Sequence, residues 1–135
     1  MLRAFLPEDM TKALADMAPF SAMEIAKLGT EPRTLIDMIV NTSAEVKTIA
    51  AGDTVLVVGG VRGQHLLANE GALWAVFTNA ARRHPLVTMR GLREASTNSR
   101  YTRLWSIVDE ACYGWVEKLG FSVGQPQGAF RDIWR

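Results

Sequence analysis

The stretch Arg103–Phe121, RLWSIVDEACYGWVEKLGF, decides the fold that the sequence predicts. Its β-branched and aromatic residues at 104–108 predict a strand, which an acidic turn follows. Apolar residues then recur at the spacing of one helix face, at Cys112, Trp115, Val116 and Leu119. Gly120 stands just past the last turn, where a left-handed residue ends many helices, and Phe121 can fold back onto the apolar face. Strand, helix and further strand predict an α/β or α+β unit.

Length and composition predict one domain over residues 1–135. A chain of 135 residues, 48% of them hydrophobic, can bury a core. The formal net charge is +1, so charge gives no reason to expect a nucleic acid or a membrane surface as a partner. Cys112 is the only cysteine, which excludes an internal disulfide and fits a reducing compartment. We find no secretory leader and no apolar run long enough to cross a membrane, and therefore expect a cytoplasmic protein.

The first third of the chain predicts one strand and three helices. Residues 1–6 form a short apolar strand, and Pro7-Glu8-Asp9 opens a helix because proline and carboxylates suit a helix start. Ser21 is the expected N-cap of a second helix, with Glu24 completing a capping box. A third helix is expected over Arg33–Asn41.

The middle of the chain predicts three strands. Two β-branched runs, 46–50 and 54–61, flank Ala51-Gly52-Asp53 as a hairpin. The glycines of 59–63 suggest a phosphate loop, but the Lys-Ser/Thr pair and a βαβ unit are missing, so we expect a strand end there. Gly71–Thr78 is a central strand, 79–84 a turn, and Pro85 opens a helix. With two short final strands, 121–123 and 129–134, the order predicts a mixed sheet with helices on both faces.

The ending of the chain resembles that of the GNAT superfamily of N-acetyltransferases. Many members carry Asn-x-x-Ala-x-x-Leu-Tyr-x-Lys-x-Gly-Phe on a helix after the fifth strand. Lys118, Gly120 and Phe121 match this motif outright. Asp109 stands in place of the Asn, and Val116 stands in place of the Tyr that protonates the leaving thiolate. The strand followed by Pro-Glu-Asp at the N-terminus is also a frequent opening in this superfamily.

The resemblance implies a fold and a cofactor. The fold is an α/β (α+β) domain whose mixed, mostly antiparallel central sheet splays open between a central strand and its neighbour. The cofactor is acetyl-CoA, without a metal. Family members hold its pyrophosphate on backbone N–H groups, where glycines let the phosphate come close. The corresponding turn here, 80–87, contains no glycine. The positions that the resemblance assigns to the cofactor are Phe77, Thr78, Arg82, Arg83 and Val87.

Acetyl transfer to an amine needs a base for the amine and an acid for the thiolate. Val116 cannot supply the acid, and Tyr113, one turn earlier on roughly the same face, is the candidate in its place. Glu70, before the central strand, and Asp109, after the fifth, are candidate bases by position. Each of these carboxylates could also be a solvated charge or a helix-start residue. His65 has no second ligand at metal spacing, so we expect no metal site.

Two functions follow from these observations. Within the superfamily the sequence most resembles small phage-encoded members of the internal virion protein A group. The first function is therefore a phage-encoded, GNAT-fold protein with lost or weak acetyltransferase activity, associated with other virion or assembly proteins or with copies of itself. The second is an active acetyl-CoA-dependent N-acetyltransferase acting on an amine of a small molecule or protein. The missing glycine and tyrosine favour the first.

Overall fold

The structure, a computed structural model, describes residues 1–27, 29, 31–63, 70–109, 113–127 and 130–134. Its strands form one sheet in the order β1-β2-β3-β4-β5-β7-β6. The strands are β1 (Leu2–Ala4), β2 (Glu45–Ala51), β3 (Thr54–Gly63), β4 (Glu70–Phe77), β5 (Arg103–Asp109), β6 (Ser122–Gln127) and β7 (Phe130–Trp134). The helices are α1 (Pro7–Ala15), α2 (Pro19–Lys27), α3 (Pro32–Thr42), α4 (Asn79–Arg83), α5 (Pro85–Thr97) and α6 (Tyr113–Lys118).

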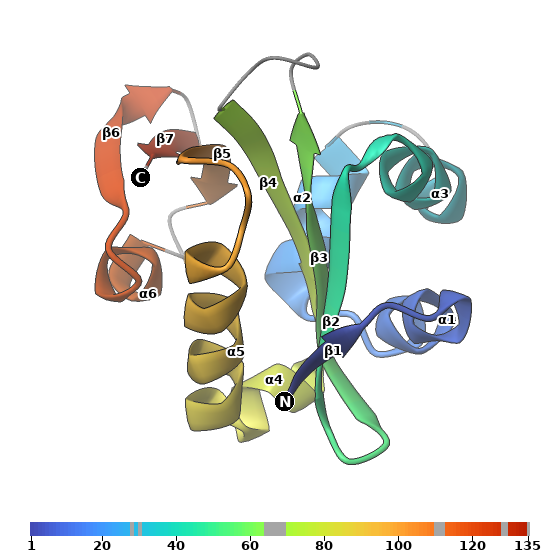
Figure 1. Ribbon diagram of the computed structural model, residues 1–135. Helices are drawn as coiled ribbons and strands as arrows, with labels where there is room; N and C mark the ends of the chain where they lie inside the picture. Colours follow the sequence, from blue (N-terminus) through green and yellow to red (C-terminus); the bar gives the residue numbers. More distant parts are fainter. Residues whose placement is uncertain (28, 30, 64–69, 110–112, 128–129, 135) are drawn as a thin grey trace.

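The predicted mixed, mostly antiparallel sheet with helices on both faces is confirmed. Neighbouring strands are antiparallel except β4 and β5, which are parallel. Helices α1 and α3 lie on one side of strands β2–β4 and α5 lies on the other (Figure 1). Val58 and Val76 of the sheet pack against Met10, Ile25 and Ile36 from α1, α2 and α3. None of the helices in the described part of the chain has the length and hydropathy that a membrane crossing needs.

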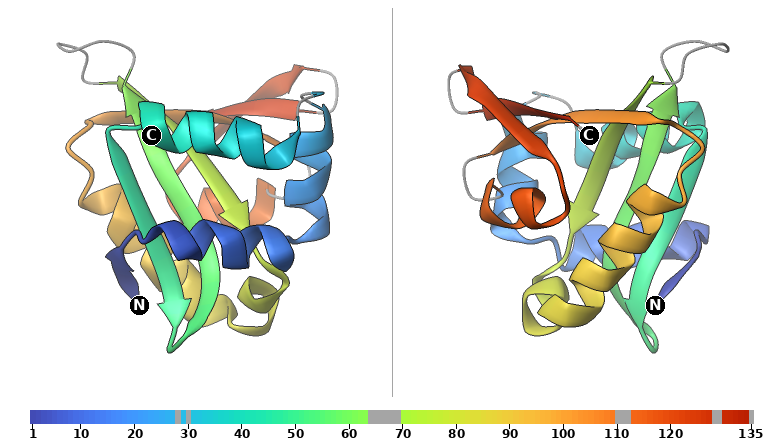
Figure 2. Two further views of the ribbon diagram at one scale, coloured as in Figure 1. Left: turned by 90° about the vertical axis from the view of Figure 1, so that its right-hand side faces the viewer. Right: turned by 60° about the vertical axis from the view of Figure 1, so that its left-hand side comes forward.

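The sheet divides where β4 and β5 separate. Their parallel pairing covers three residue pairs, from Glu70↔Arg103 to Ala72↔Trp105. Beyond Ala72 the strands diverge, and Figure 2 shows β5 turning across the top of the molecule while β4 runs downward. The predicted splay between a central strand and its neighbour is therefore present.

Two local predictions near β4 are wrong. Residues 79–83 form the short helix α4 rather than a turn, because Thr78 caps it by accepting a hydrogen bond from the Ala81 N–H with its hydroxyl, at 3.3 Å. Helix α2 begins at Pro19, so Ser21 is not its cap. The Ser21 Oγ instead accepts the backbone N–H of Phe77 at 3.0 Å.

The glycine run 59–63 continues β3 to its end at Gly63. A Cβ on Gly60 would overlap the carbonyl oxygen of Glu45 and lie 3.0 Å from the Trp74 ring. A Cβ on Gly63 would lie 2.5 Å from the Tyr101 hydroxyl. These glycines therefore make room for two aromatic side chains, which accounts for the run without a phosphate.

The predicted end of the C-terminal helix is confirmed. Gly120 has a φ of +92°, and the Phe121 N–H donates to the Val116 carbonyl at 3.2 Å. Phe121 is buried with Val116 and Leu119 in one cluster. The predictions for His65 and Cys112 concern residues outside those that the structure describes.

Candidate functional site

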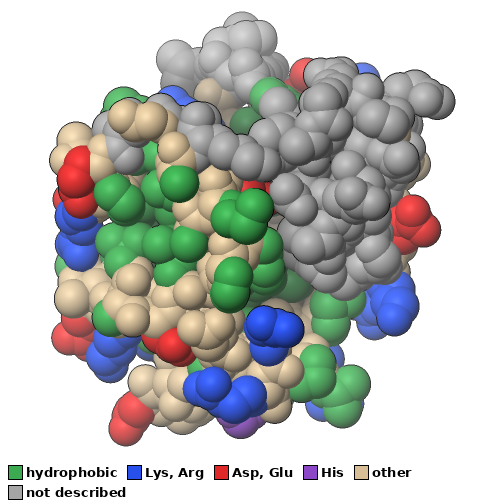
Figure 3. Space-filling view, turned by 180° about the vertical axis from the view of Figure 1, so that it is seen from behind, with side chains coloured by type: hydrophobic (Ala, Val, Ile, Leu, Met, Phe, Trp, Pro, Cys, Tyr) green, Lys and Arg blue, Asp and Glu red, His purple; other side chains and the backbone are tan. Residues whose placement is uncertain are grey.

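A cavity of about 320 Å³ lies where β4 and β5 diverge. Residues from strands β1 to β5 and from helices α2, α3, α5 and α6 line it, and most of them are apolar. Figure 3 shows the back of the molecule, where hydrophobic side chains gather in a hollow. Concave, apolar cavities with a few polar groups are the usual form of small-molecule sites. The cavity is therefore the candidate site.

The edge of β4 that faces the cavity carries backbone groups in an alternating pattern. The Thr78 N–H donates to the Leu56 carbonyl of β3 at 3.0 Å. Because ladder bonds alternate along an antiparallel strand, Trp74 and Val76 also bond to β3, whereas Leu73, Ala75 and Phe77 turn their N–H and C=O groups toward β5. Three positions of β4 therefore present backbone groups to the opening.

At two of these three positions, backbone groups form hydrogen bonds with other parts of the protein. The Leu73 carbonyl accepts a hydrogen bond from the Ser106 hydroxyl at 2.9 Å. The Phe77 N–H donates to Ser21, and its carbonyl accepts from the Ala18 N–H at 2.8 Å. In the described ranges, no hydrogen bond to the N–H or C=O of Ala75 is found on the cavity side. Ala75 is thus the open backbone position of the site.

The segment between α1 and α2 lies antiparallel to the end of β4, with Met17 opposite Thr78. Helix α2 follows directly, and the ring of Phe20 in its first turn lies 5.2 Å from the Phe77 ring, between centroids. Phe20 packs against the cluster around Val116 and Phe121 and also against the cluster that contains Phe77. Phe20 therefore connects the two halves of the divided sheet.

The first amides of α4 are also used inside the protein. The Ala80 N–H donates to Asp16 Oδ2 at 3.4 Å, and the Asn79 side chain donates to Asp16 Oδ1 at 3.1 Å. After them come Arg82, Arg83 and His84, all exposed. Figure 3 shows Lys and Arg side chains next to a histidine at the lower edge of the molecule. An anion bound beside α4 would meet guanidinium groups rather than the first amides of α4.

The structure places the predicted cofactor residues in two environments. Phe77 lines the cavity and belongs to a buried hydrophobic cluster. Val87, in the first turn of α5, packs against that cluster. Thr78 is 1% exposed and its hydroxyl donates to the Val55 carbonyl at 2.9 Å. Arg82 and Arg83 extend into solvent from α4. The roles assigned to these five residues stay predictions.

The predicted catalytic residues are dispersed. Glu70 lies at the paired end of β4, where it forms an ion pair with Arg103 at 3.4 Å, and it is outside the 320 Å³ cavity. Asp109 ends β5 and Tyr113 begins α6, and the side chains of both lie outside the described part of the structure. Val116, which stands at the position of the family tyrosine, is 2% exposed and lines the cavity.

Sequence reasoning missed most residues of the cavity, among them Ser21, Glu24, Ala75 and Ser106. Ser21 and Ser106 act on backbone groups 56 and 33 residues away, and no local pattern signals such a bond. Glu24 carries the predicted signature of a helix cap, yet it lines the cavity from α2. In the residues that the structure covers, no group of three or more His, Cys, Asp or Glu could hold a metal ion.

No protein-family model and no curated protein sequence matches the chain. Solved structures do match: an aminoglycoside 6'-acetyltransferase type Ii has a TM-score of 0.74 at 14% identity, with 100% of this chain and 96% of that chain covered. The GNAT domain of S. lividans PAT matches with a TM-score of 0.62 at 10% identity, over 99% of this chain and 88% of that one. The chain has the GNAT acetyltransferase fold.

A further GNAT-fold neighbour is the PaiA N-acetyltransferase from Thermoplasma acidophilum, solved in complex with coenzyme A. It has a TM-score of 0.64 at 11% identity, and the alignment covers 100% of this chain and 97% of that chain. At such identities the likeness establishes the fold, and function has to be argued from the site. These neighbours give no support to the narrower phage virion likeness, which stays a prediction.

Proposed function

We propose that the protein is an N-acyltransferase that takes an acetyl group from acetyl-CoA and transfers it to an amine. One observation carries the proposal: β4 and β5 separate after Ala72 and leave the backbone N–H and C=O of Ala75 facing an apolar cavity. An extended chain with amide groups can bond to such a strand edge as an added strand does. The coenzyme A complex of a protein with this fold supports the choice of cofactor.

The residues present fit the pantetheine arm of the cofactor better than its phosphates. Ala75 offers one donor and one acceptor, and Leu73 and Phe77 give apolar walls beside it. Helix α5 starts with Pro85, which has no N–H, so the Leu86 and Val87 amides are the ones at its positive end. Arg82 and Arg83 would neutralise the phosphates by guanidinium contacts. When bound, the cofactor supplies an activated acyl thioester.

The protein's own groups would then manage the protons. The acceptor must lose a proton before it attacks, and Glu24 is the carboxylate that lines the cavity from α2. Val116 cannot donate a proton to the thiolate, so we assign that role to Tyr113 at the start of α6. Asp109, at the end of β5, is the second candidate base.

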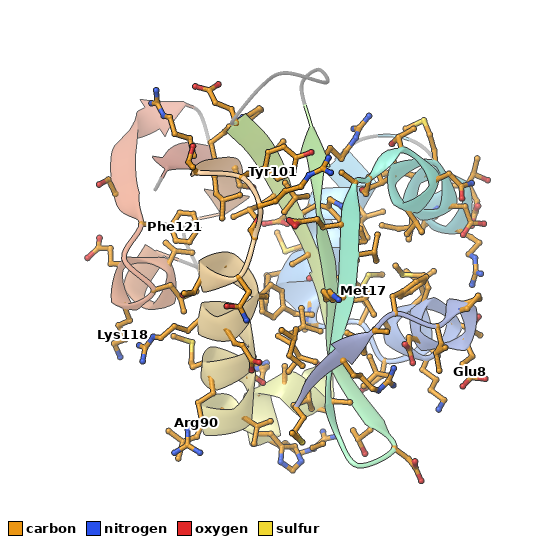
Figure 4. All side chains as sticks on the ribbon, in the orientation of Figure 1. Glu8, Met17, Arg90, Tyr101, Lys118 and Phe121 are labelled. Atoms are coloured by element: carbon orange, nitrogen blue, oxygen red, sulfur yellow. The ribbon has the colours of Figure 1, made fainter. Side chains whose placement is uncertain are left out.

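Calorimetric titration with acetyl-CoA tests the proposal. We expect the double substitution Arg82→Ala and Arg83→Ala to raise the Kd at least tenfold, or about 1.4 kcal/mol, since hydrogen bonds to charged groups contribute about that much. Arg90→Ala is the matched control, because Arg90 is exposed on α5 and points away from the sheet (Figure 4). The control should stay within twofold. Absence of binding at millimolar acetyl-CoA would overturn the proposal.

The pantetheine contact is tested separately. Ala75→Pro removes an N–H that faces the cavity and no bond to β3, so we expect the fold to be retained and the binding of both acetyl-CoA and acetyl-pantetheine to be lost. The double arginine substitution should leave acetyl-pantetheine binding unchanged, because that ligand lacks the diphosphate. If the double arginine variant lost affinity for acetyl-CoA and acetyl-pantetheine equally, the assignment of Arg82 and Arg83 would be contradicted.

A second candidate function is a GNAT-fold module that has lost its chemistry and serves in an assembly. Buried Val116 in place of the acid and the occupied amides of α4 favour it. This function predicts that acetyl-CoA binds but that no amine is acetylated, and that Tyr113→Phe leaves the binding of acetyl-CoA unchanged. If the protein is active, Tyr113→Phe should instead lower kcat with little effect on the Kd of acetyl-CoA.

A further inference from the structure

We infer that this site accepts an acyl donor whose apolar chain is longer than acetyl, and that the chain runs beneath α5 from the open edge at Ala75 toward Lys47. The inference rests on the proposed function and goes beyond it by naming the donor class, a medium-chain acyl thioester of CoA. It follows from the part of the cavity between the sheet and α5. We call this part the acyl channel, and we define it by Lys47, Gly59, Ala75, Leu92, Ala95 and Ser96.

The floor of the acyl channel is one row across three strands. Lys47 of β2 pairs with Gly59 of β3, and Gly59 pairs with Ala75 of β4. Because Ile49 and Val57 pack in the cluster on the α5 side, the residues two positions away from them face α5 as well. Gly59 and Ala75 are only half-buried, although both lie on inner strands of the sheet. The helix therefore does not fill the space above this row.

Helix α5 packs on β2 (Figure 2) and, with the residues that follow it, approaches this strand closely at two places. At the first, a Cβ added to Gly91 would come within 2.7 Å of the Ile49 side chain. At the second, the Ser99 hydroxyl donates to the Glu45 carboxylate at 2.5 Å. Lys47 lies between Glu45 and Ile49 on the same face of β2, and it is exposed. The acyl channel therefore opens to solvent at Lys47.

The acyl channel has the length and the surface that suit an alkyl chain. Adjacent strands lie about 4.8 Å apart, so the row across three strands spans about 10 Å. A fully extended chain advances about 3.4 Å for every three bonds, which gives about eight or nine bonds over that distance. Leu92 and Ala95 give the channel an apolar roof, and the Ser96 hydroxyl donates to the Leu92 carbonyl of its own helix at 2.9 Å. Such surface favours an alkyl chain over water.

Continuity with the strand edge identifies the chain as part of the donor. Ala75 belongs both to the open edge of β4 and to the floor of the channel, so a thioester bonded along this edge would direct its acyl chain beneath α5. An acetyl group would leave the channel unfilled, and an unfilled apolar space forgoes dispersion contacts. In the transfer the amine nitrogen bonds to the carbonyl carbon and releases a proton to a base. The C–S bond breaks, and the sulfur leaves with the bonding electrons as a thiolate that is then protonated.

Calorimetric titration with acyl-CoA esters of different length tests the inference. Each buried methylene contributes about fourfold in affinity, so octanoyl-CoA, with about six more methylenes, should bind at least tenfold more tightly than acetyl-CoA. Dodecanoyl-CoA should gain less than about threefold over octanoyl-CoA, because its last carbons would pass Lys47 into solvent. A further gain of tenfold or more would place the chain elsewhere and overturn the inference.

Ala95→Leu narrows the acyl channel from its roof. Leucine is a good helix former, so α5 should be retained, which circular dichroism checks. We expect this variant to weaken octanoyl-CoA binding at least tenfold and to leave the Kd of acetyl-CoA within twofold. Ser96→Leu makes the same test at the neighbouring position if Ala95→Leu does not fold. Ala15→Leu is the matched control, because Ala15 is exposed at the end of α1 and does not line the cavity, and both Kd values should stay within twofold.

The possible results separate the inference from the proposed function. Equal binding of acetyl-CoA and octanoyl-CoA, or an Ala95→Leu variant that weakens both alike, would overturn the acyl channel and leave the acetyltransferase standing. Binding of octanoyl-CoA without any binding of acetyl-CoA at millimolar concentration would uphold the channel and overturn acetyl-CoA as the donor. Absence of binding by either ester would overturn both.

Discussion

Asp9 is the residue that joins three elements near the N-terminus. It is 0% exposed, and its two carboxylate oxygens accept hydrogen bonds from Arg3 Nη1 and Nη2, each at 2.8 Å. It also accepts the Leu6 N–H at 2.8 Å and the Thr48 hydroxyl at 2.9 Å. Strand β1, helix α1 and strand β2 therefore meet at one carboxylate. Breaking a buried, hydrogen-bonded charge leaves its partners unsatisfied, which is costly.

We predict that Asp9→Asn lowers the free energy of unfolding by about 3 kcal/mol, at the low end for a buried ion pair because the Arg3 side chain is 36% exposed. Urea unfolding followed by circular dichroism measures this. The control is Asp37→Asn, which breaks the exposed Arg33–Asp37 pair on α3, at 3.0 Å. That loss should stay below about 0.5 kcal/mol. Equal losses in the two variants would contradict the role of Asp9.

The pKa of Asp9 predicts how stability depends on pH. Burial acts to raise this pKa, but the hydrogen bonds from Arg3, Leu6 and Thr48 outweigh it and lower the pKa from 3.8 to about 2. The folded protein thus stabilises the ionised form of Asp9 more than the unfolded chain does. The resulting stability, about 2 kcal/mol, is complete above pH 4 and is lost as the pH falls toward 2. The free energy of unfolding, measured at several pH values between 5 and 2, should show this loss in the wild-type protein and not in Asp9→Asn.

At the scale of elements, β2, β3 and β4 are held in register by close packing around Gly60. This glycine pairs with Val46 of β2 and with Trp74 of β4. A side chain here would push against the Glu45 carbonyl, which is backbone and cannot rotate away, and against the Trp74 ring. The glycine is needed because atoms from both flanking strands, β2 and β4, lie where its Cβ would be.

We predict that Gly60→Ala lowers the free energy of unfolding by about 2 kcal/mol, in the range for an overpacked interior. The control Arg62→Ala changes an exposed residue two positions further along β3 and should remain within about 0.5 kcal/mol. Chemical denaturation of both variants gives the comparison. A neutral or stabilising Gly60→Ala would show that the strands can move apart at no cost.

At the scale of the whole molecule, the two halves of the sheet are joined by few contacts. Strands β1–β4 form one half and β5–β7 the other, and three parallel residue pairs connect them. Phe20, in the first turn of α2, packs against clusters on both sides. The rigidity of β5–β7 relative to β1–β4 therefore depends on this side chain.

We predict that Phe20→Ala destabilises the protein by about 2 kcal/mol, less than a fully buried Phe because the ring is only partly buried. Hydrogen exchange should become faster at β5–β7 amides than at β2–β3 amides, since the join between the halves loosens first. Phe20→Leu, which keeps most of the apolar volume, is the control and should change exchange little. A uniform increase over the whole sheet would contradict this division.

The sequence predicts the order of elements well and the site only in outline. Periodicity and glycine placement locate the helix that ends before Gly120, because both signals are local. Helix α4 escapes prediction because Thr78 is both the end of a β-branched strand and a helix cap. The open position at Ala75 depends on where β4 stops pairing with β5. It also depends on bonds from distant residues to the neighbouring positions of β4, such as those from Ala18 to Phe77 and from Ser106 to Leu73. Long-range bonds of this kind leave no pattern in neighbouring residues.

The open edge at Ala75 has a consequence for inhibitors. A compound that bonds to the N–H and C=O of Ala75 would be recognised by main-chain atoms, which nineteen of the twenty amino acids supply alike. Only proline removes the donor, and we expect that change to abolish the natural ligand as well. Resistance would therefore have to arise from substitutions in the walls of the cavity. A compact inhibitor that contacts little beyond Ala75 would leave few substitutions that could weaken its binding.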